Sequence, residues 1–286
     1  MTVHLLPGQF YGVRHERVRG GLFDLGLMEA RAPEHDVHLH LHEEAHFVLV
    51  LAGTYLSSAR GAPQQAPAPA LVYNPPRTVH RDRFLGGRGR FMTVSIDPLH
   101  LDGWEGGHAG MFNARFLAQP ACLRGAFSLV RAMQGGPDGA LLESGVWELL
   151  GDTATDACAP PRQPPAWLRK AYEAVMDGPG DSDLSIARLA ADAGVHPVHL
   201  ARVFRTLLGC SPGELLRWRR IERACAMLRD AHRGLAEVAL AAGFVDQSHL
   251  THAFRQRFGI PPGAWRRRAA GERMFDGYKT VAGDPD

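Results

Sequence analysis

The pattern of apolar and polar positions divides the chain of 286 residues into two parts. Between residues 20 and 100 the pattern has a period of two or forms short apolar runs, as in "VHLHLH" (37–42), "HFVLVLAG" (46–53) and "RFMTVSI" (90–96). The turn-like stretches "GAPQQAPAPA" and "GGRGR" separate these runs, and "TVHRDRF" is a further candidate strand. Alternation of this kind is typical of β-strands, so this part predicts a small antiparallel barrel or sandwich.

From residue 113 the spacing of apolar residues changes to three and four. The stretches "FLAQPACLRGAFSLVRAMQ" and "ALLESGVWELLGDTAT" have this pattern, which predicts amphipathic helices within residues 111–157. Their apolar faces could pack against the barrel or form a dimer surface. The stretch "CAPPRQPP" (158–165) has four prolines in eight residues and predicts a stiff linker between two domains.

After the linker the chain repeats itself at an offset of 50 residues. "LARVFRTLLGCSPGELLRW" and "LTHAFRQRFGIPPGAWRRR" agree in register at the pairs Leu200/Leu250, Phe204/Phe254, Arg205/Arg255, Gly209/Gly259 and Pro212/Pro262. This agreement indicates an internal duplication of a small helical unit.

Each copy has the spacing of a helix-turn-helix. In the first copy, Ser185 is a candidate N-cap, Gly194 supplies the turn and Pro197 suits the first turn of the second helix. In the second copy Asp246 is the candidate cap, and the turn after Gly243 is one residue longer. The alternative is a plain helical bundle, which two matching copies disfavour.

One predicted helix, "ELLRWRRIERACAMLRD", connects the copies. With about 18 residues it is about 27 Å long. It can hold two recognition helices about 34 Å apart, so that they enter successive major-groove segments of one DNA face.

The charge is distributed unevenly between the two parts. The whole chain carries +2, but residues 182–270 contain 14 Arg, no Lys and seven Asp or Glu, about +7, which leaves about −5 for the remainder. A basic second part predicts a polyanionic ligand such as DNA. No run of 18 apolar residues occurs and the four cysteines are scattered. We therefore expect no membrane contact, no disulfide framework and a cytoplasmic location.

The segment 184–267 resembles the DNA-binding domain of AraC/XylS-type transcription regulators, most specifically in "AAGFVDQSHLTHAFRQRFGIPPGAWR". Residues 1–110 resemble, less specifically, the cupin-like effector domains of such regulators. The resemblance implies an α+β fold: a cupin-like β-barrel with helices, then an all-α domain (166–286) with two helix-turn-helix units joined by a linker helix. It implies a regulator of promoter DNA that responds to a small-molecule or metal effector, forms a homodimer and contacts RNA polymerase.

Residues that contact DNA are expected on the exposed face of each second helix, near its N-terminal end. In the two copies these are Val198, His199, Ala201, Arg202, Arg205, Gln247, Ser248, Thr251, His252 and Arg255. Arg202 is the best candidate for a guanine contact, because a guanidinium can donate two hydrogen bonds to one base. Arg205 and Arg255, together with Arg219 and Arg220, are expected to contact phosphates or solvent.

The stretch "HDVHLHLHEEAHF" holds five of the 15 histidines. When this stretch is aligned with the first cupin motif, His40, His42 and His46 occupy motif positions, and "NPPRTVHRD" supplies His80 from the second motif. Cupins that bind metal have Glu at the position of His46. Such imidazoles suit one divalent transition metal, Zn²⁺, Ni²⁺ or Fe²⁺. A metal-free effector pocket and a structural role remain alternatives. Asp82 shares a face with His80 and could orient a histidine, or it could pair with Arg81 or Arg83 at the surface.

A second hypothesis is an enzyme, a metal-dependent cupin oxygenase fused to a DNA-binding module. The same histidines would hold iron, but no substrate-orienting residues beyond them are evident in the sequence. The sequence therefore favours a regulator without catalytic residues.

Overall fold

The computed structural model describes residues 2–97, 113–135, 138–155, 164–181 and 183–276. Contacts divide the chain into two compact units, Met1–Glu173 with Ala201–Cys210, and Ala174–Leu200 with Ser211–Asp286. The division falls inside α3 (Ala166–Asp177) and not at the predicted linker, of which residues 158–163 lie outside the described residues. The reason is that the buried Tyr172 of α3 donates a hydrogen bond of 2.9 Å to the main-chain oxygen of Leu51.

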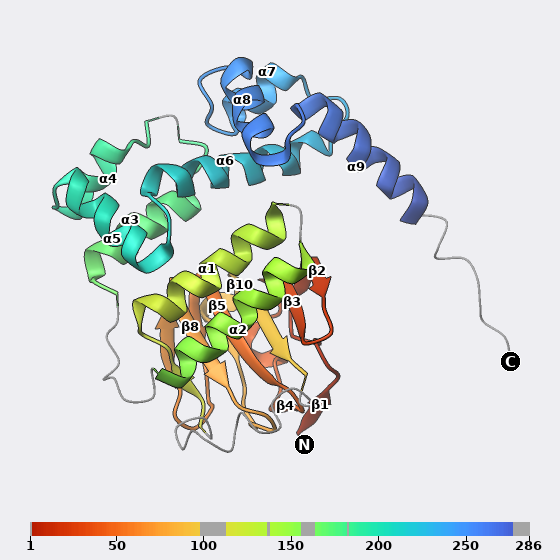
Figure 1. The fold of residues 1–286 in the computed structure, drawn as a ribbon, viewed down its shortest axis with the longest axis vertical. Coiled ribbons are helices and arrows are strands. Elements are labelled where there is room, and N and C mark those ends of the chain that lie inside the picture. Colours follow the sequence, from red (N-terminus) through yellow and green to blue (C-terminus); the bar gives the residue numbers. More distant parts are fainter. Residues whose placement is uncertain (1, 98–112, 136–137, 156–163, 182, 277–286) are drawn as a thin grey trace, which may run out of the picture. The chain divides into compact units, whose positions relative to one another are not determined.

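The first unit is a sheet-rich, barrel-like domain (Figure 1). Its six-stranded antiparallel sheet has the order β11 (Arg115–Phe116), β8 (Ala70–Asn74), β5 (Ala45–Ala52), β10 (Gly89–Ile96), β3 (Phe23–Ala30) and β2 (Val13–Arg19). A three-stranded sheet has the order β7 (Gln65–Pro67), β6 (Thr54–Leu56) and β9 (Arg83–Phe84), and β1 (Val3–Leu5) pairs in parallel with β4 (His40–His42).

The central strands of the large sheet are buried on both faces. Consecutive residues of β5 such as Val48, Leu49 and Val50 are each at most 3% exposed. A continuous apolar run of this kind requires cover on both sides of the sheet. Part of this cover comes from α1 (Pro120–Gln134), which packs against β8 and against α2 (Gly139–Thr155).

Several predicted boundaries are wrong. The alternating stretch 37–42 is a strand only at His40–His42, because residues Glu34–Asp36 form a 3₁₀ turn before it and Leu39 is 48% exposed. In "TVHRDRF" only Arg83–Phe84 is a strand, since the chain turns at Pro75, whose oxygen accepts from the Thr78 hydroxyl at 2.7 Å. The strands β1 and β2 were not predicted.

The two amphipathic helices are present as predicted, but the region from residue 111 is not helical from its start. β11 pairs with β8 through Arg115 and Tyr73 before α1 begins. Pro120 occupies the first turn of α1, where its missing N–H leaves no hydrogen bond unmade. In the first unit, Arg124 and Arg131 of α1 donate to the main-chain oxygens of Thr206 and Leu208, each at 2.9 Å.

The helices after α3 form the predicted duplication. The first pair is α4 (Ile186–Ala193) and α5 (Pro197–Leu208), the second is α7 (Leu235–Ala241) and α8 (Gln247–Phe258), and the connecting helix is α6 (Pro212–Leu228). α9 (Pro262–Asp276) follows α8. Among the described residues, no helix combines the length and the apolar character needed to span a membrane.

Local sequence fixes the ends of these helices as expected. The Ser185 hydroxyl accepts from the main-chain N of Arg188 at 3.2 Å, and the Asp246 carboxylate accepts from His249 N at 2.7 Å. Gly194 ends α4 with φ of 66°, a conformation that glycine adopts at little cost. The second turn is one residue longer, because α5 begins three residues after Gly194 and α8 four residues after Gly243.

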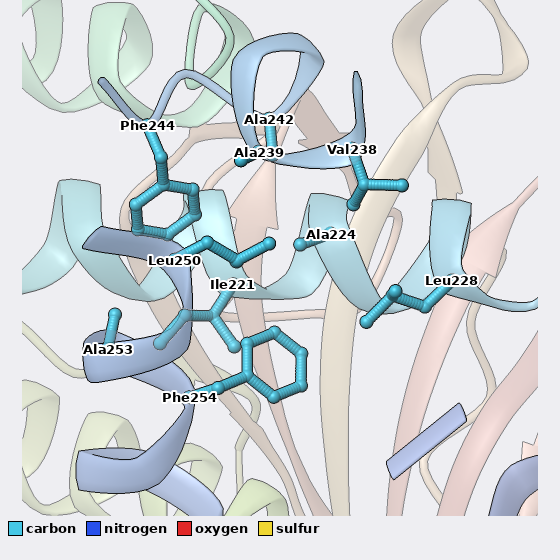
Figure 2. Packing of buried hydrophobic residues seen from close by; sticks show 10 residues of the cluster. All are labelled: Ile221, Ala224, Leu228, Val238, Ala239, Ala242, Phe244, Leu250, Ala253 and Phe254. Carbon is cyan, nitrogen blue, oxygen red and sulfur yellow. The ribbon is translucent and has the colours of Figure 1, made fainter. Parts of the chain in front are cut away.

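The second helix-turn-helix and α6 share one core (Figure 2). Ile221, Ala224 and Leu228 of α6 pack against residues of α7 and α8, among them Leu250 and Phe254, which are fully buried. Trp265 of α9 is partly buried and packs against this core, and Trp218 is also partly buried.

Candidate functional site

Four histidines lie close together inside the barrel domain. His40 and His42 share one side of β4, His46 is the second residue of β5, and His80 follows the turn after β8. The main chains of His40 and His80 bond to each other in both directions, with N–O distances of 2.8 and 2.9 Å. Ring centroids are 4.4–5.5 Å apart in every pair except His40 and His46, and each residue is at most 3% exposed.

Hydrogen bonds fix the proton positions of two of these rings. His40 Nδ1 lies 2.8 Å from the main-chain oxygen of His38. A carbonyl only accepts, so Nδ1 carries the proton and Nε2 keeps its lone pair. His46 Nε2 lies 3.1 Å from Asn74 Nδ2, an amide nitrogen that donates to it. This bond engages the Nε2 lone pair of His46.

The other two rings differ, because His42 and His80 have no hydrogen-bond partner among the described residues at either ring nitrogen. A buried polar atom left without a partner costs about 1–3 kcal/mol. Native proteins bury few such atoms without a reason, and a ligand site is one.

Burial keeps three of the four imidazoles neutral. Burial, with smaller contributions from His80 and His40, lowers the pKa of His42 to about 3. Burial also lowers the pKa of His40 and holds that of His46 well below its usual value. These three rings are therefore unprotonated at neutral pH, the form in which an imidazole ligates a metal.

Asp82 supplies a buried negative charge beside the histidines. Its Oδ2 accepts from the Tyr55 hydroxyl and lies 3.5 Å from His80 Nε2, and its Oδ1 is buried without a hydrogen-bond partner. Burial raises the pKa of Tyr55 well above its usual value, so the phenol keeps its proton. Asp82 does not pair with its neighbours in sequence, because Arg81 donates to the main chain of Val37 and Glu34 and Arg83 to the carboxylate of Glu34.

The four histidines do not form one ligand set. His40, His42 and His80 each place a ring nitrogen within 4.8 Å of the other two, and His46, His80 and Asp82 form a second such group. The first group has the better donors, because His46 is engaged by Asn74. The other two histidines of this stretch, His35 and His38, are exposed.

The cavity beside the cluster is closed by residues that the sequence analysis missed. Phe10 stacks on His42 with a centroid distance of 4.6 Å, and Tyr11 lies 5.1 Å from His40. Gly8 N donates to the buried Glu44 carboxylate at 2.7 Å, which holds this segment in place. The cavity offers about 40 Å³ to the centres of water molecules. One water needs about 10–15 Å³ by this measure, so the space is small.

All ten candidate DNA-contact residues lie on α5 or α8 and none is buried. His199, Ala201 and Thr251 are half-buried, and the exposed ones are Val198, Arg202, Arg205, Gln247, Ser248, His252 and Arg255. The exposed positions cover the first turns of each helix, where side chains of a recognition helix reach base edges.

Two arginines expected to contact phosphate or solvent are engaged by the protein itself. Arg219 pairs with Glu222 and donates to the main-chain oxygen of Met176 at 3.0 Å. Arg220 donates to the oxygens of Pro179 and Asp181, both at 3.0 Å. The expectation was wrong because the sequence shows the charge of an arginine but not the direction of its side chain.

A ligand-binding barrel followed by a duplicated helix-turn-helix defines the class of regulators that join sensing and DNA binding in one chain. The AraC-like ligand binding domain profile matches residues 23–150, and the helix-turn-helix domain profile matches residues 189–268. The chain belongs to the AraC family of transcription regulators.

Individual relatives match over about a third of the chain. The right origin-binding protein of Escherichia coli K12 is 34% identical over 92 residues, 32% of each chain, so the match spans about a third of that relative. The probable transcription factor PqrA of Proteus vulgaris is 31% identical over 83 residues, 29% of this chain and 68% of PqrA. The C-terminal domain of AraT from Geobacillus stearothermophilus has 28% identity and a TM-score of 0.36, covering 37% of this chain and 88% of that chain.

Proposed function

We propose that this protein binds a specific DNA sequence through α5 and α8, and that a ligand held by the barrel histidines controls this binding. The observation that carries the proposal is the pair of buried imidazoles, His42 and His80, whose ring nitrogens have no hydrogen-bond partner among the described residues. A ligand that binds one arrangement of the protein better than another shifts the population toward that arrangement.

We propose further that the ligand set is His40, His42 and His80 and that it holds one divalent transition metal, Zn²⁺, Ni²⁺ or Fe²⁺. Three imidazoles with nitrogens within 4.8 Å of one another can converge on an ion at about 2.0–2.1 Å. The bond from His40 Nδ1 to the His38 carbonyl is the kind of second contact that orients a metal-binding histidine. Asp82 offsets part of the ion's charge.

Three protein ligands would leave a coordination position on the cavity side. A metal bound there would supply a Lewis acid to which a donor atom of a small effector binds. The oxygenase alternative is not favoured, because no substrate-orienting residues beyond these histidines are evident in the sequence.

The test is elemental analysis of tag-free protein purified without a nickel column. We expect about one equivalent of metal in the wild type and in His38→Ala, an exposed neighbour that serves as the matched control. We expect none in His42→Ala or in His80→Ala, each checked for folding by circular dichroism. Absence of metal from every folded protein would contradict the metal proposal and favour a metal-free organic effector.

The DNA proposal is tested separately. Wild-type protein is used to select binding sites from random duplex DNA, and the affinity for the selected site is compared with that for scrambled DNA at one salt concentration. Removal of the metal with a chelator should change the affinity for the selected site only. Equal affinity for selected and scrambled DNA would contradict sequence-specific binding.

We also propose a homodimer formed through α2, where Leu141 and Trp147 are 61% and 43% exposed. Light scattering should show a dimer that Trp147→Glu converts to a monomer, and a monomeric wild type would contradict this. Contact with RNA polymerase and a cytoplasmic location stay predictions.

A further inference from the structure

The two helix-turn-helix units meet where α6 contacts the loop before α4 and the turn after α7. Arg220 Nε and Nη2 donate to the oxygens of Pro179 and Asp181 in the loop before α4, each at 3.0 Å. Arg223, one turn further along α6, donates through Nε to the oxygen of Ala241 at the end of α7, at 2.9 Å. We call this contact the junction; its members are Pro179, Gly180, Asp181, Arg220, Arg223, Ala241 and Gly243.

The chain segments approach so closely at the junction that only glycine fits at position 243, and a side chain at position 180 would have little room. Gly243 has φ of +91°, and a Cβ there would lie 2.4 Å from the oxygen of Pro179 and 2.8 Å from Arg220 Nε. A Cβ at Gly180 would lie 3.1 Å from Arg223 Nε and 3.2 Å from the oxygen of Ala241. The loop that leads into the first helix-turn-helix therefore lies directly against the turn of the second helix-turn-helix.

The connecting helix α6 also packs against the second helix-turn-helix through its apolar residues. Ile221, Ala224 and Leu228 pack into the core shared with α7 and α8 (Figure 2). Burial lowers the pKa of Arg220, yet its guanidinium stays charged at neutral pH and keeps both hydrogen bonds. The first helix-turn-helix is thus held to α6 by Arg220. α6 is held to the second helix-turn-helix by its apolar face and by Arg223.

We propose that Arg220 and Arg223, together with Gly180 and Gly243, set the number of base pairs between the two DNA half-sites that this protein recognises. This inference rests on the proposed DNA-binding function. The arginines are positioning residues that act through α5 and α8, since their donors are engaged by main-chain oxygens of the protein.

Base-pair spacing is a sharp test of rigidity. Each inserted base pair moves one half-site by about 3.4 Å along the DNA axis and rotates it by about a tenth of a turn. Two recognition helices held rigidly cannot follow such a change without losing contacts in one half-site. Two helices joined loosely can follow it at a smaller cost.

The experiment uses the full chain and a two-part site selected from random DNA with the wild-type protein. Duplexes with one or two base pairs inserted or deleted between the half-sites are then compared in affinity at fixed salt. We expect the wild type to bind a one-base-pair change about tenfold more weakly. Arg220→Lys keeps the charge, but one ammonium cannot reproduce the planar fork that serves two carbonyls. We expect its spacing profile to flatten to within about threefold.

Gly243→Ala should flatten the profile in the same way without any change in charge. Arg217→Ala is the matched control, since Arg217 is exposed on the same helix. Its profile should keep the wild-type shape even if every affinity falls. Wild-type profiles in Arg220→Lys and Gly243→Ala, or a loss of affinity equal at all spacings, would overturn the inference. If Arg220→Lys does not fold, Gly243→Ala and Arg223→Lys decide the question. Selection of a one-part site alone would also overturn the inference, whereas failure of the wild type to select any site would instead refute the DNA-binding function.

Discussion

The two copies of the helix-turn-helix agree and differ in a regular way. Most of the pairs that agree at the offset of 50 are buried or lie at a helix end, and the exposed pair Arg205/Arg255 is an exception. Leu200 and Leu250 are fully buried, as are Phe204 and Phe254. Gly209 and Gly259, which end α5 and α8, have φ of +69° and +70°.

Three pairs that differ lie at exposed or half-exposed positions of α5 and α8. Val198 corresponds to Ser248, Ala201 to Thr251, and Arg202 to His252. The shared residues therefore specify the fold of a unit, and the differing residues leave each unit free to read its own DNA sequence. We therefore expect an asymmetric two-part DNA site.

The largest expected effect concerns the shared positions. Phe204→Ala and Phe254→Ala each leave a cavity in a closely packed core, and we expect each to lower the free energy of unfolding by about 3–5 kcal/mol. Urea unfolding followed by circular dichroism measures both. Thr206→Ala and Gln256→Ala, at exposed positions of the same helices, should change stability by less than about 0.5 kcal/mol. A much smaller cost in one copy would show that the two cores are not equivalent.

This agreement explains why the helical part could be predicted from the sequence in detail. The duplication gave each motif twice, and helix-turn-helix spacing depends on local features such as the Ser185 and Asp246 caps and the turn glycines. The ends of α4, α5, α6 and α8 follow from such features. The junction could not be predicted, because Arg220 and Gly243 are far apart in sequence and meet only through tertiary contacts.

The barrel domain shows the opposite case. The alternation of apolar and polar residues predicted strands and a histidine-lined interior. It could not predict which histidines would form the proposed ligand set, since that depends on the bond between His46 and Asn74. The segment with Phe10 and Tyr11 carries no sequence signal for its place beside His42. Its position depends on β1, a strand of three residues whose pairing with β4 is parallel and distant in sequence.

The second prediction concerns the exposed positions that differ. Arg202→Ala should lower the affinity for the selected site by about 1–3 kcal/mol and relax the base preference in one half-site only, since a bidentate arginine–guanine contact is lost. His252→Ala should act on the other half-site, with a smaller loss. Repeating the selection from random DNA with each variant measures both effects. Relaxed preference in the same half-site for both variants would contradict separate reading by the two copies.

The smallest expected effect separates the two caps. Ser185→Ala and Asp246→Ala each remove a side chain that accepts from a main-chain N–H, and each should cost about 1 kcal/mol of stability. Asp246 also places a negative charge at the N-terminus of α8, where the helix dipole stabilises it by about 0.3–1 kcal/mol. We therefore expect Asp246→Ala to cost more than Ser185→Ala at low salt. The difference in cost between the two variants should disappear at high salt, because salt screens the charge but not the hydrogen bond.

The matched variant Asp246→Ser keeps a cap without the charge and should lose only the part of the stability that depends on salt. Urea unfolding of the three variants at two salt concentrations measures this, and equal costs that do not change with salt would mean that the caps act through hydrogen bonding alone.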